Sequence, residues 1–375
     1  MDLQLTSDQL LLQETTTRFL QDTSPLTKVR ELEHNPDGFE RDWWQRGAEL
    51  GWTSMLAPEA LGGGSISGQA LRDLALVAFE RGRMVAPGPF VPSNVVVAAL
   101  GAAATLTADQ ESWVARLMEG SAVGAIAIEE TGGPWGVSGI GTRAEPTADG
   151  LVLTGTKAPV EAAAEAEVFV VAAVSDDGPV LVLVPADTEG LTVTRRETID
   201  LVRRFGTVHM EGVVVPSSAT LSVGPTAVEN LLDIANALSL AETVGALDRV
   251  FEFTLEWAFD RHTFGRPLAS YQELKHRFAD MKLWLEASKA TVVAAVTALA
   301  DGSGAASELV STAKSYVSEH GPELVQDCVQ MHGGIGVTWD HDIHLYLRRV
   351  TLNSAIHGTT RDHRERLASM ILQGA

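Results

Sequence analysis

The chain has 375 residues, and single hydrophobic cores stop growing near ~250–300 residues, so its length favours two or three packed domains. Apolar residues make up 45% of the sequence and charged residues 21%, which excludes a disordered or collagen-like chain. With 28 Lys and Arg against 49 Asp and Glu, the net charge of −21 repels phosphate backbones and anionic lipids, so we expect neither nucleic acid nor a membrane as a partner.

The chain contains one cysteine, Cys328, which excludes an intrachain disulfide bond and any metal site built from several cysteines. No base stands beside Cys328 in the sequence pattern, and we expect a buried helical thiol. The amino-terminal residues lack a basic segment followed by an apolar one, and no run of ~18 consecutive apolar residues occurs. We therefore expect no signal peptide, no membrane span and a cytoplasmic location.

Residues 1–123 carry the apolar spacing of helices. Thr6 or Ser7 can cap the first helix. Further helices are expected over residues 42–50 and 71–85, and a helix buried on nearly all sides over residues 95–106. The apolar positions expected in the first helix are Leu10, Leu11, Phe19 and Leu20.

Residues 124–223 change to short runs of Val, Ile, Leu and Thr separated by Gly, Pro and Asp, which is the pattern of strands and turns. Asp176-Asp177-Gly178 is a hairpin turn signal between two of these runs. The pattern predicts a compact β-barrel or sandwich of about 100 residues. The expected strands cover residues 151–156, 168–174, 180–184, 191–194 and 213–215.

Residues 224–375 return to a helical pattern, with one very long helix expected from Val228 to Arg261. Three more helices are expected over residues 271–299, 305–332 and 345–372. Four long helices with short connections predict a bundle. The expected fold class is therefore α+β with three domains, which are a helical domain at residues 1–123, a β domain at 124–223 and a four-helix bundle at 224–375.

The first motif with a chemical interpretation follows the long helix, at Arg261-His262-Thr263-Phe264-Gly265-Arg266-Pro267. In an acidic protein, two arginines beside a glycine can bind a diphosphate, because guanidinium groups match phosphate oxygens in a two-pronged geometry. The alternative is an ordinary helix end, where cations complement the helix dipole and the proline stops the helix. From spacing alone, the helix end is the commoner explanation.

Two further segments contain candidate site residues. Gln330 precedes Gly333 and Gly334, and paired glycines after an amide can present N–H groups to a phosphate or a ribose; the alternative is a glycine-rich helix terminus. His357 precedes Thr359 between two helical stretches, where the histidine could act as a base or a ligand or could serve only in packing. The sequence contains no zinc-protease motif, nucleophile elbow or Walker loop.

These segments, in a chain whose pattern runs from helices to strands and back to helices, resemble the acyl-CoA dehydrogenase family. The resemblance extends from Leu5 to Leu372 and is most specific at residues 261–281 and 330–349. Residues 52–63 and 151–157 also resemble motifs of the family's amino-terminal and β domains. The resemblance implies the same three-domain fold and FAD as the cofactor.

In that family, one chain's β domain and carboxyl-terminal elbow hold the flavin ring, while the neighbouring chain reaches across with its RxxFG and QxxGG residues. The resemblance implies that the cross-interface set is intact in this chain. It also assigns Thr359, in the elbow, to the cofactor. The cross-interface residues are Arg261, Thr263, Phe264, Gln330, Gly333 and Gly334.

The set that holds the flavin ring departs from the family's pattern. The TEPxxGSD segment corresponds to Glu129–Trp135, where Ser-Asp is missing. The WITN segment corresponds to Ala158–Glu161, where Pro159 has no N–H to donate. The catalytic Glu of the family's elbow is His357 here, and the position that carries the base in a few other members is Ala237.

The base that would remove the α-proton of a thioester is therefore unassigned, and His357 and Glu242 are the two candidates. A histidine can act as a base only when it is neutral, as it can be near neutral pH. Glu242 lies about one and a half helical turns beyond Ala237, which is a poor register for that role. We expect Glu242 to be buried and paired with an arginine or the backbone.

The resemblance leaves three hypotheses for the function. The first is a subunit of a hetero-oligomer, with two copies of each of two chains, that shares FAD with a second acyl-CoA dehydrogenase-like subunit. Its reaction would be α,β-desaturation of an acyl-CoA, as in β-oxidation or steroid catabolism, with electrons passed to an electron-transferring flavoprotein. The second is a self-sufficient homotetramer that uses His357 or Glu242 as base, and the third is a non-catalytic structural subunit.

Overall fold

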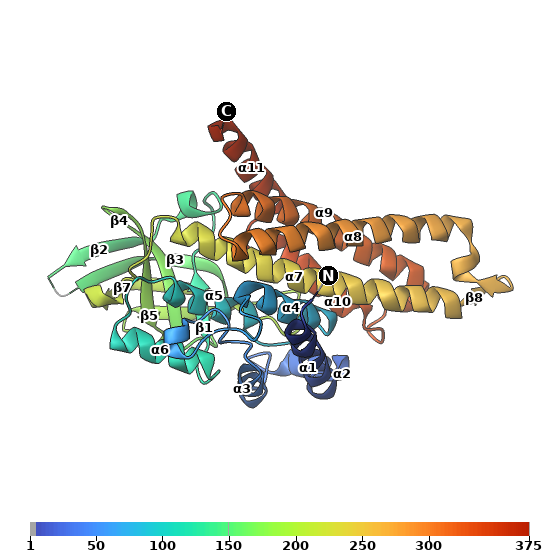
Figure 1. Cartoon of the computed structure of the whole chain (residues 1–375), viewed down its shortest axis with the longest axis horizontal. Helices are drawn as coiled ribbons and strands as arrows, with labels where there is room; N and C mark the ends of the chain where they lie inside the picture. The colour runs from blue at the N-terminus through green and yellow to red at the C-terminus, as the bar shows by residue number, and fades with distance from the viewer. Residues whose placement is uncertain (1–4, 149, 375) are drawn as a thin grey trace.

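The amino-terminal domain is helical, as predicted. The computed structural model describes residues 5–148 and 150–374. Thr6 caps the first helix in a capping box with Gln9, and Leu10 and Leu11 lie in this helix, as expected. Both leucines are about half exposed, because the buried face runs through Gln9, Leu12, Thr16 and Leu20. The helices are α1 (Ser7–Thr23), α2 (Leu26–Glu31), α3 (Arg41–Glu49), α4 (Ala70–Arg83), α5 (Phe90–Gly101) and α6 (Ala108–Met118) (Figure 1).

The helix predicted at residues 95–106 is α5, which begins and ends about five residues earlier. It is buried on nearly all sides, as expected, because it packs between α7, α6 and strand β1. Pro92 stands in its first turn, where a proline costs the helix no hydrogen bond. The start was predicted too late because the continuous apolar run begins only at residue 95.

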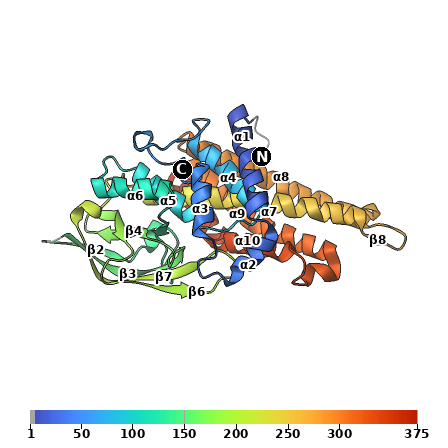
Figure 2. The ribbon, with the colours of Figure 1, turned by 90° about the horizontal axis from the view of Figure 1, so that it is seen from below.

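The central domain is one curled seven-stranded sheet rather than a closed barrel or a two-sheet sandwich (Figure 2). Its path is β1-β4-β2-β3-β7-β6, and β5 pairs with β4. The five predicted strands are all present, but the short strands β1 and β2 were missed and β7 is much longer than predicted. The strands are β1 (Gly124–Ala127), β2 (Arg143–Thr147), β3 (Gly150–Glu161), β4 (Val168–Ser175), β5 (Gly178–Pro185), β6 (Leu191–Arg196) and β7 (Phe205–Val215).

The carboxyl-terminal domain is a bundle of long helices that runs along the molecule (Figure 1). The single helix predicted at residues 345–372 is two helices, because the chain bends at His357 and Gly358, which both have positive φ. The hairpin of β8 (His262–Thr263) and β9 (Arg266–Pro267) lies at the far end of α7. The helices are α7 (Ala227–Asp260), α8 (Gln272–Ala300), α9 (Ala306–His332), α10 (Ile343–Ala355) and α11 (Thr360–Gly374).

Two glycines let the amino-terminal domain approach the bundle closely. A Cβ at Gly82 on α4 would lie 1.8 Å from the backbone oxygen of Glu242, and one at Gly245 on α7 would lie 1.9 Å from the backbone oxygen of Phe79. No side chain fits at either position without moving a helix. The backbones of α4 and α7 therefore cross in contact, and this contact fixes the domain junction beside Glu242.

Helix α8 is long and apolar enough to cross a membrane by length and composition alone. It packs along α9 and α7, and the core helix of a bundle meets the same test. Cys328 on α9 is fully buried, as predicted, and burial raises the pKa of its thiol to about 12.

Candidate functional site

A groove of about 700 Å³ lies where α7 and α9 end and α8 begins. Five of the predicted cofactor residues line it, so the structure brings together segments that are about seventy positions apart in the sequence. These five are Arg261, Thr263, Gln330, Gly333 and Gly334, and the remaining lining residues are Trp257, Leu268, Glu273, Leu274, Arg277, Asp327, Met331, His332 and Ile335.

Arg261 is the carboxyl cap of α7, so the helix-end geometry considered for this motif is present. Its backbone N–H donates to the oxygen of Trp257 over 2.8 Å, while its exposed guanidinium lies 5.9 Å from the centre of the Trp257 ring. Within residues 5–148 and 150–374, Arg261 forms no ion pair with a carboxylate. A helix-end arginine with an unpaired guanidinium at a groove can still bind an anion.

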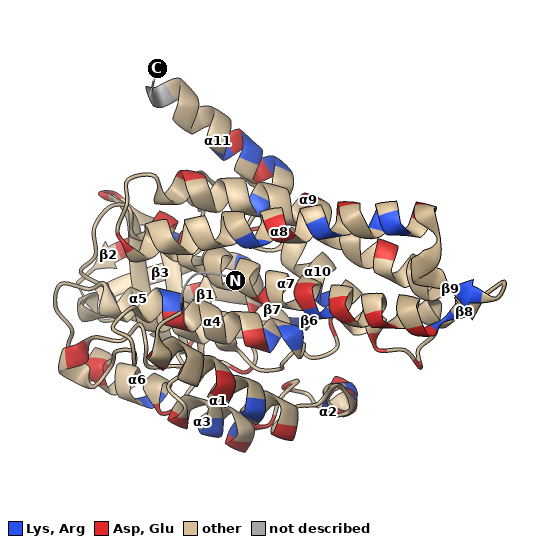
Figure 3. Ribbon diagram, turned by 45° about the vertical axis from the view of Figure 1, so that its right-hand side comes forward, with Lys and Arg blue, Asp and Glu red and all other residues tan. Residues whose placement is uncertain are grey.

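The glycines leave the backbone of the groove uncovered. Gly333 ends α9 with φ +63, and a Cβ at Gly333 or Gly334 would meet nothing within 4 Å. Phe264 is not part of the groove: it sits at the tip of the β8–β9 hairpin, 94% exposed, with φ +52. The hairpin also carries Arg266, and Arg261 directly precedes it; Figure 3 shows the basic residues in blue around β8 and β9, at the end of α7.

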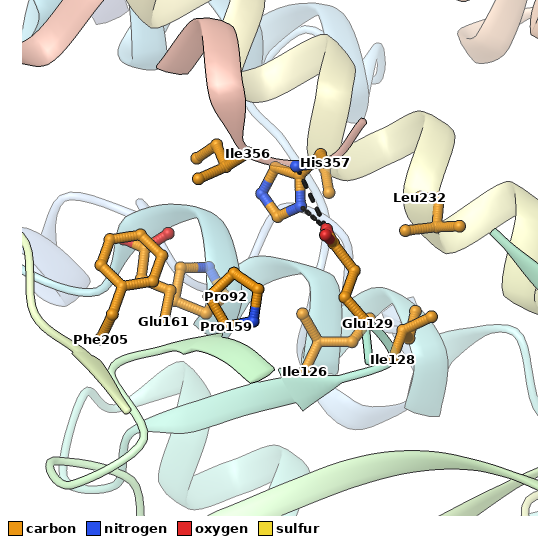
Figure 4. A pocket seen from close by; sticks show the side chains of 11 residues that line it. Pro92, Ile126, Ile128, Glu129, Pro159, Glu161, Phe205, Leu232, Ile356 and His357 are labelled. Atoms are coloured by element: carbon orange, nitrogen blue, oxygen red, sulfur yellow. Dashed lines mark hydrogen bonds and ion pairs between the residues drawn. The ribbon is translucent and has the colours of Figure 1, made fainter. Parts of the chain in front are cut away.

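A second space, much smaller, lies between the sheet and the bend after α10. Its volume is about 20 Å³, which holds about one water molecule. Figure 4 shows His357 and Glu129 facing each other across it. We call it the inner cavity, and its lining residues are Pro92, Ile126, Ile128, Glu129, Pro159, Glu161, Phe205, Leu232, Ala235, Ile356 and His357.

His357 is held by Glu129. Its backbone N–H donates to Glu129 Oε1 over 3.1 Å, and its Nδ1 lies 3.4 Å from the same oxygen. Its Nε2 is buried and has no hydrogen-bond partner among the described residues. If Nδ1 carries the proton toward Glu129, Nε2 is the free acceptor of the imidazole.

Buried polar groups also fix the backbone of this bend. The His357 carbonyl accepts from Asn236 Nδ2 over 3.0 Å and from His363 Nε2 over 2.9 Å. Lys314 on α9 donates to the carbonyls of Asn353 and Ile356 over 2.6 and 2.7 Å. These contacts hold His357 at φ +56, a conformation that a non-glycine residue keeps only when its surroundings determine it.

Thr359 does not lie in the groove. It precedes α11, and its backbone N–H and hydroxyl both donate to Asp362 Oδ2, over 2.8 and 2.7 Å. This is the geometry of a residue that caps the start of a helix. Its assignment to the cofactor stays a prediction.

Glu242 lies in a buried ion-pair network, so the pairing with arginine that we expected is confirmed. Its two oxygens accept from Arg349 and Arg203, each over 2.9 Å, and Asn353 also donates to it. Burial alone would raise the pKa of Glu242, but the two guanidinium groups outweigh burial and lower it. Arg349 also pairs with Asp200 over 2.6 Å.

Glu161, which corresponds to the end of the family's WITN segment, belongs to the same network through an ion pair with Arg203. Glu130 is likewise engaged, by the buried Lys157 over 2.6 Å and by Thr142 over 2.8 Å. Internal ion pairs thus occupy both segments in which the sequence departs from the family's pattern. Sequence reasoning missed Arg203 and Lys157 as partners, because no local pattern links residues that are more than twenty positions apart.

Comparisons with known proteins match the two helical domains. Residues 6–121 match the model of the acyl-CoA dehydrogenase N-terminal domain and residues 224–372 match that of the acyl-CoA dehydrogenase C-terminal domain. The acyl-CoA dehydrogenase FadE27 of Mycobacterium tuberculosis is 31% identical over 84% of either chain. Two solved structures are similar to this chain. A variant of the Tcur3481–Tcur3483 steroid ACAD has 30% identity and a TM-score of 0.87 over 98% of both chains. The ChsE4–ChsE5 complex from M. tuberculosis has 26% identity and a TM-score of 0.89 over 99% of both chains.

Proposed function

The chain belongs to the acyl-CoA dehydrogenase family, whose members are FAD-dependent oxidoreductases, and on this premise we propose that it is one subunit of a hetero-oligomer whose partner holds the flavin ring. The observation that carries the proposal is the contrast between the two spaces. The groove at Arg261 measures about 700 Å³, within the usual range for ligand sites, whereas the inner cavity measures about 20 Å³.

The residues present fit one part of FAD and not the other. Arg261, the Gln330 amide and the open backbone at Gly333 and Gly334 offer donors to a diphosphate and a ribose. The inner cavity cannot admit an isoalloxazine ring, because it holds about one water molecule between Pro159 and the bend. This chain would therefore contribute to a flavin site without holding the ring itself.

The proposed reaction is α,β-desaturation of an acyl-CoA thioester. FAD accepts a hydride from the β-carbon when it is bound in such a site. This chain's part is to bind and orient: Arg261 neutralises phosphate charge and the Gln330 loop supplies polar contacts. The base that removes the α-proton would belong to the partner, because this chain has a histidine at the elbow position of the family's glutamate.

The substrate, acceptor and location are further parts of the proposal. The similarity to the steroid ACAD and to the two-chain ChsE4–ChsE5 complex supports a bulky acyl-CoA, such as a steroid side-chain thioester, and a second acyl-CoA dehydrogenase-like subunit. Electrons would leave to an electron-transferring flavoprotein, in the cytoplasm.

The second candidate is a self-sufficient homo-oligomer with His357 as base. The observation that favours it is the unpartnered Nε2 of an imidazole whose Nδ1 lies beside the Glu129 carboxylate. Glu242 is a poor base, because both its oxygens are engaged by arginines and its pKa is lowered. A third candidate, a structural subunit that shares no flavin, differs from the first only at the groove.

Arg261 separates the first candidate from the third. In a complex with the partner chain, Arg261→Ala removes a charge-assisted contact of roughly 1.5–3 kcal/mol, so FAD affinity should fall about 10- to 150-fold. Arg261→Lys should recover only part of the lost FAD affinity, because the lysine ammonium is a point charge and cannot form the two-pronged contact of a guanidinium. FAD retained after gel filtration is the measurement, with assembly checked by mass.

Arg249→Ala is the matched control for this experiment. It also removes an arginine from α7, but Arg249 is paired with Glu252 on the helix surface, away from the groove. FAD retention should be unchanged in the control. Unchanged retention in a correctly assembled Arg261→Ala complex would favour the structural subunit over a shared flavin site.

A further inference from the structure

Trp135 occupies the junction between the bend at His357 and the loop that follows β1. Its ring centre lies 4.4 Å from that of His363 and 5.8 Å from the guanidinium of Arg366. A Cβ at Gly358 would lie 2.7 Å from the Trp135 ring, so only glycine leaves room for the indole there. The indole is packed into the bend itself.

Trp135 is held by packing rather than by a hydrogen bond. Its Nε1 is buried and has no partner within the described residues. The loop that carries it has positive φ at Gly132 and Gly136, on either side of the tryptophan. These two glycines have backbone angles that other residues rarely adopt. They let the loop turn on both sides of the tryptophan and so place its ring in the bend.

The indole also lines the first of two neighbouring spaces. A cleft of about 640 Å³, which we call the outer cleft, lies between this loop, the start of α7 and α11, with Trp135 in its wall. The inner cavity of about 20 Å³, with His357, lies beyond. Leu232 lines both spaces, so the two are neighbours. Trp135 packs against Gly358, the residue directly after His357, on the side of the outer cleft.

We infer that Trp135 seals the inner cavity beside His357 against the outer cleft, so that no acyl chain enters from this side and thioester chemistry is confined to the partner's site. The inference rests on the proposed function, since it explains how the chain can share one flavin site without forming a second. The charges agree: Glu229, Asp362 and Glu365 line the outer cleft, and its one arginine, Arg366, is paired with Asp233 over 2.5 Å. A CoA thioester, which carries several negative charges, therefore gains little electrostatic attraction in the outer cleft.

The test is the accessibility of His357 to diethyl pyrocarbonate, a small reagent that acylates unprotonated imidazole. Trypsin releases residues 350–361 as a peptide whose only histidine is His357, and residues 262–275 as one whose only histidine is the exposed His262. Mass spectrometry can therefore follow both rates in one sample. The samples are the full chain as wild type, Trp135→Ala, Trp135→Phe and Trp284→Ala.

Trp284→Ala is the matched control, because Trp284 is also half-buried and stacked on a histidine, His320, but lies on α8 away from the cavity. We expect slow modification of His357 in the wild type and in this control. Trp135→Ala should raise the rate at His357 by about tenfold or more, since protection depends on the free energy of local opening. Trp135→Phe, which keeps a ring in place, should stay close to the wild type.

Fast modification of His357 in the wild type, relative to His262, would overturn the inference, and that result does not depend on any variant folding. Protection that persists in a folded Trp135→Ala chain would overturn it as well. The FAD content of the same wild-type sample tests the proposed function separately. A flavin-loaded chain would refute the proposed function and remove the basis of the inference, whereas fast modification of His357 in a flavin-free chain would refute the inference alone.

Discussion

At the scale of single residues, His357 shows what one sequence position can and cannot disclose. The resemblance to the family places it at the elbow, but its state depends on Glu129, 228 positions away, and on Asn236, Lys314 and His363. These partners determine its positive φ and leave Nε2 free. No local pattern predicts contacts over such separations, so the residue could be named and its surroundings could not.

His357→Ala should change turnover of the assembled complex by much less than tenfold, because the proposed base belongs to the partner. Losing a true base typically costs about 10²–10⁴ in rate. Steady-state turnover per complex is the measurement, with FAD content and assembly compared with those of the wild type. A loss in that larger range, with both intact, would move the catalytic role to this chain.

The network around Glu242 makes a prediction about acid stability. Burial alone would raise the pKa of Asp200, but its ion pair with Arg349 outweighs burial and brings the pKa to about 2, below the ordinary value of 3.8. As pH falls, Asp200 is therefore protonated at a higher pH in the unfolded chain than in the folded chain. About 2 kcal/mol of stability should be present above pH ~4 and lost toward pH ~2.

Asp200→Asn should therefore lower the free energy of unfolding at neutral pH and flatten its dependence between pH ~4 and ~2. Urea unfolding across that range is the measurement. Asp301→Asn is the control, because Asp301 pairs with Arg72 on the surface and should contribute little. Equal acid sensitivity in wild type and Asp200→Asn would show that the network is not the source.

At the scale of elements, the long helices and the apolar strands could be predicted because their periodicity is strong. The failures were local. The strands β1 and β2 are too short to show a period, and β7 is interrupted by Gly206, His209 and Gly212, so only its apolar end was recognised. One helix was predicted over residues 345–372 although His357 was placed between two helical stretches, because the helical spacing continues on both sides and only His357 and Gly358 leave it.

A substitution of Lys314 tests what holds the break between α10 and α11, because the Lys314 side chain on α9 donates hydrogen bonds to carbonyls at the end of α10. Burial lowers its pKa to about 7, yet its amine can donate to both carbonyls in either protonation state. Lys314→Met should leave those carbonyls unsatisfied, at a cost of about 1–3 kcal/mol. Hydrogen exchange of the amides at residues 353–358 should become faster.

The exposed Lys282→Met provides the comparison, since it removes a surface lysine from α8 and should leave that exchange unchanged. If exchange at residues 353–358 is the same in Lys314→Met and wild type, the lysine does not hold the bend.

At the scale of the whole molecule, the sequence predicted the groove better than the inner cavity. The groove residues that were predicted lie in two contiguous motifs, at the ends of α7 and α9, so the packing of these two helices brings the motifs together. The inner cavity depends on the packing of a sheet, a bend and a loop, and its small volume is a property of all three. The replaced segments at Glu129–Trp135 and Ala158–Glu161 were visible in the sequence, but the ion pairs of Glu130 and Glu161 and the packing of Trp135 on Gly358 were not.

The central claim is that this chain offers one half of a flavin site and cannot hold the ring alone. The direct measurement is FAD per chain by absorbance, together with oligomeric mass, for the chain purified alone and for the chain purified with its partner. We predict far less than one FAD per chain alone, and a yellow complex with near-stoichiometric FAD per heterodimer once the partner is present. A yellow homo-oligomer of this chain with near-stoichiometric FAD would contradict the claim.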